Sequence, residues 1–207
     1  MDGLYLSAVV RELRNTILGS RIEKVHQPDS TRLVLSLSRK RRLLMSASPD
    51  APALYLCENA PANPDRPPAF CQLLRKRITG AVVEGIDQPG LERMVNITLH
   101  ATNEYAEPCV LRLVIEIMGK HSNIILVDDS LTIIAAIKRV GSEINRYRQV
   151  LPGLPYVAPP QQDKLELPDI DRDALIKRLG TLEDSPLWRA LLHSVAGVGP
   201  HTAKEVA

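Results

Sequence analysis

Aromatic residues are scarce in this chain, which has one tryptophan, one phenylalanine and five tyrosines in 207 residues. Proteins that bind single-stranded nucleic acid without sequence preference stack successive bases on aromatic side chains. The composition therefore argues against a surface of that kind. The hydrophobic content of 44% is still sufficient for a sizeable core, and that core must be mainly aliphatic.

Cysteines are also few. Cys57, Cys71 and Cys109 show no C-x-x-C spacing, and an odd number leaves one unpaired in any disulfide scheme. Each has apolar neighbours, so we expect them to act as small buried hydrophobic residues. The five histidines do not stand at metal-ligand spacing, and the chain has neither a nucleophile elbow nor a phosphate-cradling loop motif. We therefore predict no metal, no cofactor and no catalytic group.

The sequence has no apolar run of about 18 residues, and no export signal precedes Asp2. We therefore expect a cytoplasmic protein that does not enter a membrane. A secreted adhesin would normally need an export signal, so this absence counts against that class.

The net charge of +2 is small but unevenly distributed. Residues 1–160 contain 20 of the 26 lysines and arginines against 16 of the 24 acidic residues. The basic excess belongs to the first part of the chain, where it is compatible with an anionic partner.

Hydrophobic periodicity predicts an α+β fold. Apolar residues at helical spacing predict a helix over 4–18, with Gly19 just after its end. A second helix is predicted from Ala69, because the preceding Pro67-Pro68 suits a first turn. Alternating or β-branched stretches predict mostly antiparallel strands at 21–26, 33–38, 43–47, 54–57, 81–86, 94–99, 109–118, 123–127 and 132–137.

Four prolines between 152 and 160 predict an extended linker that begins near residue 150. Helical periodicity follows, with Asp171 or Asp173 as a candidate cap and Ser185-Pro186 as the start of another helix. We therefore expect a mostly antiparallel β domain with two helices over residues 1–165 and a small all-α domain over 166–207.

The end of the chain fits the helix-hairpin-helix pattern. Its apolar, glycine and alanine positions are Leu192, Val195, Gly197, Val198, Gly199, Ala203 and Val206. The glycines permit a tight turn, and the amides at the start of the second helix can meet a phosphate. Gly197, Gly199 and Lys204 are therefore candidate nucleic-acid contacts. The chain stops within this second helix, so we expect a truncated domain.

Residues 116–128 read EIMGKHSNIILVD, in which two apolar stretches flank five polar or small residues. This pattern predicts a β-hairpin that turns at Gly119. Lys120, His121, Ser122 and Asn123 bring a cation, an imidazole, a hydroxyl and an amide to one loop, and such groups can hold a phosphate backbone or orient a base. The alternative is a solvated turn whose serine and asparagine bond their own backbone.

The remaining basic residues form four groups. Residues 39–42 are predicted at a hairpin tip, where a solvated turn is the default. Residues 75–77 end a helix, where cations suit the helix dipole. Lys138 and Arg139, with Arg146 and Arg148, bracket a polar loop and are candidate phosphate contacts. The pair Glu92-Arg93 is, in isolation, an ordinary acid-base pair at the start of a strand.

Several short motifs, taken in order, resemble those of the NFACT family, which includes ribosome quality control factors and proteins long labelled fibronectin-binding protein A. The motifs are Asp2-Gly3, Gly19-Ser20-Arg21-Ile22, Gln27-Pro28, residues 43–47, residues 67–71, Leu74-Arg75-Lys76, residues 116–128 and Leu151-Pro152-Gly153. The resemblance extends over essentially the whole chain, in the order of the family's N-terminal half.

This resemblance implies a factor that binds tRNA and large ribosomal subunits obstructed by peptidyl-tRNA. Such factors promote template-free C-terminal tailing of the stalled nascent chain, with alanine in bacteria. Because the ribosome performs the peptidyl transfer, the resemblance implies a binding factor that is not itself an enzyme. A family Asp-Arg pair required for tailing aligns with Glu92-Arg93, and an early aspartate aligns with Asp2. The implied tRNA or ribosome contacts are Asp2, Arg75, Lys76, Glu92, Arg93, Lys120, His121, Ser122, Asn123, Arg139, Arg146 and Arg148.

The expected two-domain plan is also similar to that of formamidopyrimidine-DNA glycosylases. Those enzymes use an N-terminal proline amine followed by a glutamate, and Met1-Asp2-Gly3 supplies neither, so we do not expect that activity. Two alternatives stay open. One is a glycosylase-like nucleic-acid-binding protein of DNA repair, and the other is an extracellular-matrix protein that binds fibronectin or fibrinogen.

Overall fold

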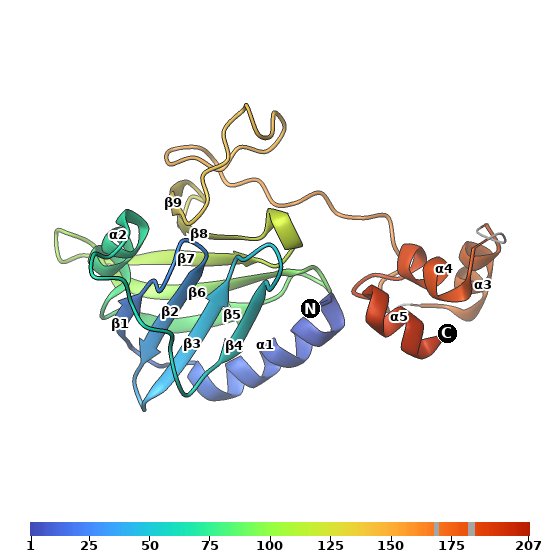
Figure 1. Cartoon of the computed structure of the whole chain (residues 1–207), viewed down its shortest axis with the longest axis horizontal. Helices are drawn as coiled ribbons and strands as arrows, with labels where there is room; N and C mark the ends of the chain where they lie inside the picture. Colours follow the sequence, from blue (N-terminus) through green and yellow to red (C-terminus); the bar gives the residue numbers. More distant parts are fainter. Residues whose placement is uncertain (168–169, 182–184) are drawn as a thin grey trace.

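The computed structural model of the chain describes residues 1–167, 170–181 and 185–207, and these form two antiparallel sheets and five α-helices (Figure 1). The helices are α1 (Gly3–Ile17), α2 (Ala69–Ile78), α3 (Arg172–Gly180), α4 (Leu187–Ser194) and α5 (Pro200–Val206). The strands are β1 (Ile22–His26), β2 (Arg32–Leu37), β3 (Arg41–Ser46), β4 (Ala53–Leu56), β5 (Val82–Asp87), β6 (Met94–Thr102), β7 (Pro108–Glu116), β8 (Asn123–Asp128) and β9 (Ile133–Ala136). The predicted α+β class is confirmed.

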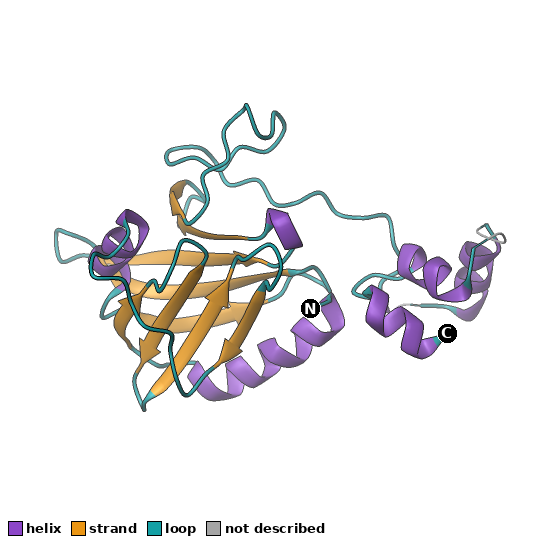
Figure 2. Ribbon diagram, viewed as in Figure 1, coloured by secondary structure: helices purple, strands orange, loops and turns teal. Residues whose placement is uncertain are grey.

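Each sheet follows the order of the chain. The first sheet is β1-β2-β3-β4 and the second is β5-β6-β7-β8-β9, with every neighbouring pair antiparallel. Figure 2 shows the two sheets as stacked layers, with α1 along one side and α2 at one end. One apolar cluster, drawn from both sheets and both of these helices, fills the space between the layers. Because that core contains a single phenylalanine, its volume comes from leucine, isoleucine and valine, as the composition requires.

Helix α1 has a clear local cause. Leu6, Val9, Leu13 and Ile17 recur at helical spacing and are almost completely buried. They pack the helix against β4 and β5. The helix ends before Gly19, whose φ of +74° places it in the left-handed region that favours glycine at a helix end.

The second sheet is buried on both faces along β7 and β8. Its outer face carries a smaller apolar cluster that includes Val114, Ile125, Val127 and Val150. This explains why β8 reads as a nearly continuous apolar run and not as an alternating one.

The structure corrects the predicted start of the linker. Residues 150–156 still belong to the second sheet's outer layer, because the Ile133 amide donates to the Leu154 carbonyl at 2.8 Å and the Tyr156 amide donates to the Leu131 carbonyl at 2.8 Å. The proline spacing suggested free chain there, but backbone hydrogen bonds at the non-proline positions hold it. The extended segment seen in Figure 1 follows this region.

Beyond the extended segment, α3, α4 and α5 form a small helical group (Figure 1). Asp171 occupies the N-cap position of α3, although its side chain makes no capping hydrogen bond. A backbone pair ties Leu165 to the end of α4, with the Leu165 amide donating to the Ser194 carbonyl at 2.8 Å. The boundary at residue 165 stays a prediction. In the described ranges, no helix has the length and apolar character needed to cross a membrane.

Candidate nucleic-acid interface

Asp2 joins the first helix to the last one. One carboxylate oxygen accepts the Tyr5 amide at 2.9 Å and caps α1. The other accepts the Gly199 amide at 3.1 Å and the Thr202 hydroxyl at 2.5 Å, at the start of α5. Burial acts to raise the pKa of Asp2, but the hydrogen bonds from Thr202, Tyr5 and Gly199 outweigh it and hold that pKa below its usual value. Asp2 is therefore an ionised link between two helix starts.

The backbone comes very close at this junction. The Leu4 amide donates to the Gly197 carbonyl at 3.0 Å. A Cβ added to Gly3 would lie 1.8 Å from the Leu91 carbonyl oxygen and 2.8 Å from the Gly197 Cα atom, which no side chain could satisfy. Gly197 also has a φ of +75°. Both glycines are thus required by contact or conformation, and Gly197 serves packing in addition to the tight turn that its motif predicted.

The loop before β6 is attached to the same junction. The Gln88 side-chain amide donates to the Gly3 carbonyl at 2.9 Å and to the Glu92 carbonyl at 2.8 Å. Glu92 is half-buried, whereas the Arg93 side chain is exposed. Burial lowers the pKa of the nearby Lys164, and the positive charge of Arg93 lowers it further while Glu92 opposes the change. The pair Glu92-Arg93 therefore lies beside a second cation that the sequence had not indicated.

The 119–123 turn divides into exposed and buried members. Gly119 has a φ of +57°, as the predicted turn requires. Residues 119–121 form a short 3₁₀ helix between β7 and β8, and the side chains of Lys120 and His121 are exposed. Ser122 and Asn123, in contrast, are almost completely buried. Hairpin pairing of the two strands is thus confirmed, with a 3₁₀ helix as its turn.

The two buried members of this turn hydrogen-bond to the protein itself. The Ser122 hydroxyl oxygen accepts the Met118 amide at 2.8 Å. The Asn123 side chain donates to the Lys138 carbonyl at 2.9 Å and accepts the Lys138 amide at 3.1 Å. The structure therefore corrects the prediction for these two side chains: they hold the turn and the loop after β9 in place and do not face a partner.

Backbone pairing brings Arg93 next to the turn. The Ile117 amide donates to the Arg93 carbonyl at 2.8 Å, and Met94 is the register partner of Glu116. In Figure 1 the N-terminus and the short helical turn between β7 and β8 lie at the same end of the sheets. We call the exposed side chains of Arg93, Lys120 and His121 the basic edge.

The polar loop after β9 contributes unequally. Arg139 and Arg146 are exposed. Lys138 is half-buried, donates to the Ala47 carbonyl at 2.5 Å, and has a pKa lowered by burial. Of these three cations, the two arginines are the ones whose side chains are exposed.

The Arg148 side chain is mostly buried. Its guanidinium forms an ion pair with Glu116, whose side chain is 0% exposed, and one guanidinium nitrogen donates to a carboxylate oxygen at 3.1 Å. The Tyr156 hydroxyl donates to the same carboxylate at 2.8 Å, and the Arg148 guanidinium lies 5.5 Å from the centre of the Tyr156 ring. Burial and the Glu116 carboxylate raise the pKa of Tyr156. The predicted phosphate contact at Arg148 is therefore corrected: in this arrangement its guanidinium balances a buried carboxylate.

The cations of α2 lie elsewhere. Arg75 donates to the Val25 carbonyl at 2.9 Å, and Lys76 forms an ion pair with Glu104 at 3.2 Å. In Figure 1, α2 lies at the opposite end of the sheets from the N-terminus. The structure does not bring Arg75 and Lys76 to the basic edge.

The start of α5 is also occupied from within the chain. The Gly199 amide, a candidate phosphate donor, bonds to Asp2. The Lys204 ammonium lies 5.1 Å from the centre of the Trp188 ring, an intramolecular cation–π contact. A carboxylate thus takes the place that the motif would offer to a phosphate.

The sequence reasoning missed Gln88, Glu116, Tyr156 and Lys164. A signal for Glu116 was present, because it is the one acidic residue in the mainly apolar run 111–118, and a buried carboxylate needs a buried partner. The Gln88 contact could not be found in this way, because it joins residues 85 positions apart.

The fold and this site together define a class of α+β protein. In this class, buried polar groups support exposed cations at one end of two antiparallel sheets, beside the start of the first helix. The chain belongs to the NFACT family: the family described as NFACT N-terminal and middle domains matches residues 2–207.

Curated relatives agree with this assignment. The chain is 36% identical over 208 residues to the Rqc2 homolog RqcH of Bacillus subtilis, a match that covers 99% of this chain and 36% of that protein. It is 40% identical over 210 residues to the Rqc2 homolog RqcH of Streptococcus pneumoniae, covering 99% of this chain and 38% of that protein. The chain thus spans less than two fifths of the length of these relatives.

Solved structures share the fold. The N-terminal domain of fibronectin-binding protein PavA from Streptococcus pneumoniae is similar with a TM-score of 0.89 and 39% identity, over 99% of this chain and 77% of that one. The N-terminal part of the fibronectin/fibrinogen-binding protein from Streptococcus suis gives a TM-score of 0.88 and 36% identity, over 100% and 78%. The fibrinogen-binding protein from Staphylococcus aureus gives 0.86 and 29%, over 99% and 73%.

Proposed function

We propose that this chain is the tRNA- and ribosome-contacting N-terminal part of a ribosome-associated quality control factor. Membership of the NFACT family, with relatives named as RqcH, supports the role of a ribosome quality control factor. The observation that supports an RNA contact is the basic edge, where Arg93 and Lys120 are exposed and Glu92, which precedes Arg93, is half-buried. The factor acts in the cytoplasm.

The proposed partners are tRNA and a large ribosomal subunit that still carries peptidyl-tRNA. Arg93 can form two parallel hydrogen bonds to a phosphate or a base edge, and Lys120 supplies a point charge to the backbone. Glu92 orients the arginine or accepts from a base. Arg139 and Arg146 extend the positive surface along the neighbouring loop.

The proposed role is binding and not catalysis. The factor recruits tRNA so that the ribosome itself adds residues, alanine in bacteria, to the stalled chain without a template. Within this role the α4–α5 pair is a helix-hairpin-helix element, but its contact with Asp2 makes it a part of the scaffold. Asp2 then acts through the position of the helices and not by touching RNA.

The direct test is a titration of the chain with a tRNA transcript at several salt concentrations. We expect affinity to fall as salt rises, because phosphate contacts release counterions. Arg93→Ala should weaken binding roughly tenfold, since a charge-assisted hydrogen bond is lost. Arg11→Ala, which removes an exposed arginine from α1, is the matched control. Glu92→Asp, which restores the family's acid, should be tolerated.

Two results would end the proposal. One is the absence of salt-dependent affinity for any tRNA, and the other is equal binding by the Arg93→Ala and Arg11→Ala variants. Co-sedimentation with large ribosomal subunits, compared with retention on immobilised fibronectin, tests the extracellular-matrix alternative in the same preparation. The fibronectin- and fibrinogen-binding descriptions belong to the neighbouring structures.

A further inference from the structure

A second basic surface lies on the outer face of the first sheet. Lys24, Ser36 and Arg42 are register partners across β1, β2 and β3. The segment 59–63 passes beside them and borders an open cavity of about 740 Å³. That volume falls within the roughly 300–1,000 Å³ typical of ligand sites. We call it the basic groove; its lining includes Lys24, His26, Lys40, Arg41, Arg42 and Asn63.

The charges of the basic groove are not balanced by the protein. Among its described lining residues, Glu23 is the single carboxylate. In the described part of the chain, Lys24, Lys40, Arg41 and Arg42 form no ion pair. Arg42 instead donates to the Glu58 carbonyl, which ties the covering segment to β3. A concave surface with such a charge excess attracts anions.

The hairpin that carries these cations is strained. Arg39 and Lys40 have φ values of +62° and +57°. Glycine or asparagine would occupy such positions at less cost. Stability alone therefore does not explain two long cations at this tip, and backbone strain of this kind is found at functional sites.

His26 and Asn63 supply the groove with polar ring and amide groups. The Asn63 side-chain nitrogen lies 3.0 Å from the His26 Nδ1 atom, which fixes the ring against the covering segment. Burial lowers the pKa of His26, and the positive charges of Arg75, Lys24 and Arg42 lower it further. Two of the groove cations, Lys24 and Arg42, therefore act on His26.

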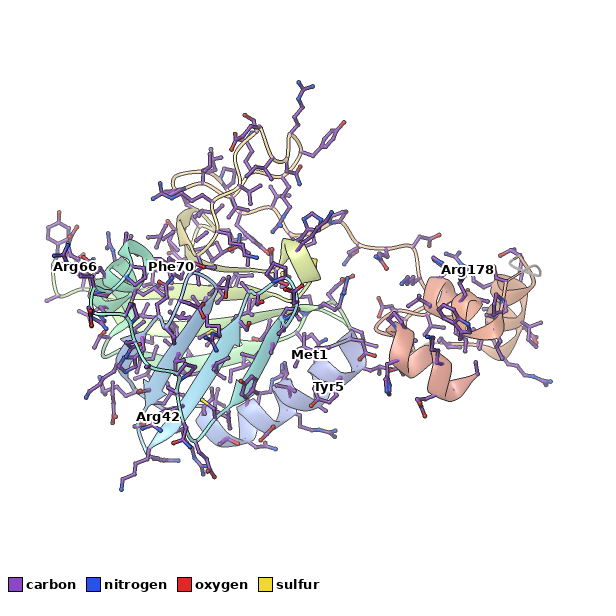
Figure 3. All side chains as sticks on the ribbon, viewed as in Figure 1. Met1, Tyr5, Arg42, Arg66, Phe70 and Arg178 are labelled. Atoms are coloured by element: carbon purple, nitrogen blue, oxygen red, sulfur yellow. The ribbon has the colours of Figure 1, made fainter. Side chains whose placement is uncertain are left out.

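We propose that the basic groove binds phosphate groups of RNA and is a second RNA contact, separate from the basic edge. The groove is at the start of β3, where Arg41 and Arg42 lie, whereas Ala47, just after the end of the same strand, contacts Lys138 beside the 119–123 turn. Figure 3 shows Arg42 and Met1 well apart on the sheet domain. An RNA that reaches both sites must extend along the first sheet.

This inference rests on the proposed function only for the source of the phosphate. Inorganic phosphate and adenosine monophosphate carry a phosphate group without an RNA chain. Each is therefore tested separately from tRNA. His26 provides a local signal, because it is the one histidine of five that lines the groove. Its imidazole resonance, assigned with His26→Gln, should shift when a tRNA transcript is added.

The binding experiment uses two variants of equal charge. Lys24→Gln with Arg41→Gln removes two of the four groove cations without removing a hydrogen bond of the described side chains. Arg11→Gln with Lys177→Gln removes two exposed cations elsewhere. If both groove cations contact phosphates, the slope of log affinity against log salt should fall by roughly 1.4 to 1.8 in the groove variant. It should not change in the control.

A third variant separates function from folding. Arg39→Asn with Lys40→Gly relieves the strained tip, so its melting temperature should rise while its affinity for tRNA falls. Loss of binding through misfolding cannot produce that combination.

The possible results decide between the two proposals. If tRNA binds but the groove variant keeps the wild-type slope and His26 does not shift, the inference is overturned and the proposed function stands. If phosphate or adenosine monophosphate shifts His26 and tRNA does not, RNA as the source is overturned. If no tRNA binds at all, both proposals fail.

Discussion

Arg148 and Arg93 are the same residue type, and both were predicted to contact phosphate, yet they occupy opposite environments. The Arg148 side chain is 15% exposed and is paired with the fully buried Glu116. Arg93 is exposed at the end of the sheets, and among the described residues only its backbone is held, because its carbonyl accepts the Ile117 amide. The Arg148 guanidinium is paired inside the fold, whereas the Arg93 guanidinium is exposed to solvent.

The comparison shows what a cluster of cations in a sequence can mean. A buried carboxylate requires a cation for its own neutralisation before any cation is free for a partner. In this chain the requirement comes from Glu116, which is 32 residues away from Arg148 in sequence. Whether an arginine can contact a partner therefore depends on where the acidic residues are buried. Each of the following variants tests either a group that is held inside the fold or a group that is exposed.

The largest effect is expected for Arg148→Ala. The change leaves the Glu116 carboxylate buried with only the Tyr156 hydroxyl as a described side-chain partner. Removing one member of a buried ion pair costs about 3–5 kcal/mol, so the free energy of unfolding should fall by that amount in urea denaturation. Arg146→Ala, an exposed neighbour, should change it by less than about 0.5 kcal/mol. Similar values for the two variants would remove the distinction drawn between the buried and the exposed arginines.

The next effect is expected at Asp2. Asp2→Ala removes the cap of α1 and both contacts to the start of α5. A lost cap costs up to about 2 kcal/mol, and we expect amide hydrogen exchange to accelerate in α5 as well as in the first turn of α1. Asp2→Asn keeps a good capping group and should show a smaller change. Faster exchange in α1 alone would show that the contact with α5 contributes nothing.

The same contact predicts a pH dependence. The folded-state pKa of Asp2 lies below its usual value of 3.8, so folding favours the ionised form. Its contribution to stability is fully present above that value and is lost as the pH falls through the lower, folded-state pKa. Exchange in α5 should therefore accelerate below about pH 3.8 in the wild type, and Asp2→Asn should not show that step.

Much of the fold could be predicted from local pattern. The helix over residues 3–17 and every strand between β1 and β9 follow from periodicity that acts within a few residues. Strand β6 extends three residues beyond its predicted end, to Thr102, because His100, Ala101 and Thr102 continue the alternation of exposed and buried positions. The predictions were wrong where the structure depends on contacts between residues that are distant in sequence.

The site was less predictable for the same physical reason. The polarity of Ser122 and Asn123 correctly indicated a turn, but only tertiary contacts decide that their side chains bond to Met118 and Lys138 and face inward. The link between Asp2 and Thr202 spans 200 residues. No spacing rule could have connected the first helix to the last.

A smaller loss of stability is expected for Gly119→Ala. The left-handed conformation at Gly119, with a φ of +57°, costs about 1 kcal/mol for a residue with a Cβ atom. The space around an added Cβ is adequate, since the nearest atom, the Pro49 carbonyl oxygen, would lie 3.8 Å away. The loss should therefore come from the backbone, and Gly119→Asn should recover part of it because asparagine tolerates this region. If alanine and asparagine destabilise equally, the strain explanation is wrong.

The smallest effect on stability is expected for Lys120→Ala, one residue further along the same turn. The Lys120 side chain is exposed, so the free energy of unfolding should change by less than about 0.5 kcal/mol. If Lys120 contacts a phosphate of the RNA, the variant should nevertheless weaken tRNA binding and reduce the salt slope by roughly one phosphate contact. Lys177→Ala, an exposed lysine on α3, controls for the loss of charge alone.

Gly119→Ala and Lys120→Ala thus separate the structural and the binding role of two adjacent residues. Gly119→Ala should lower stability with little effect on tRNA binding by the folded protein. Lys120→Ala should weaken tRNA binding with little effect on stability. A Lys120→Ala variant that binds tRNA with the wild-type salt slope would assign the whole turn to the fold and leave Arg93 as the cation to test at this edge.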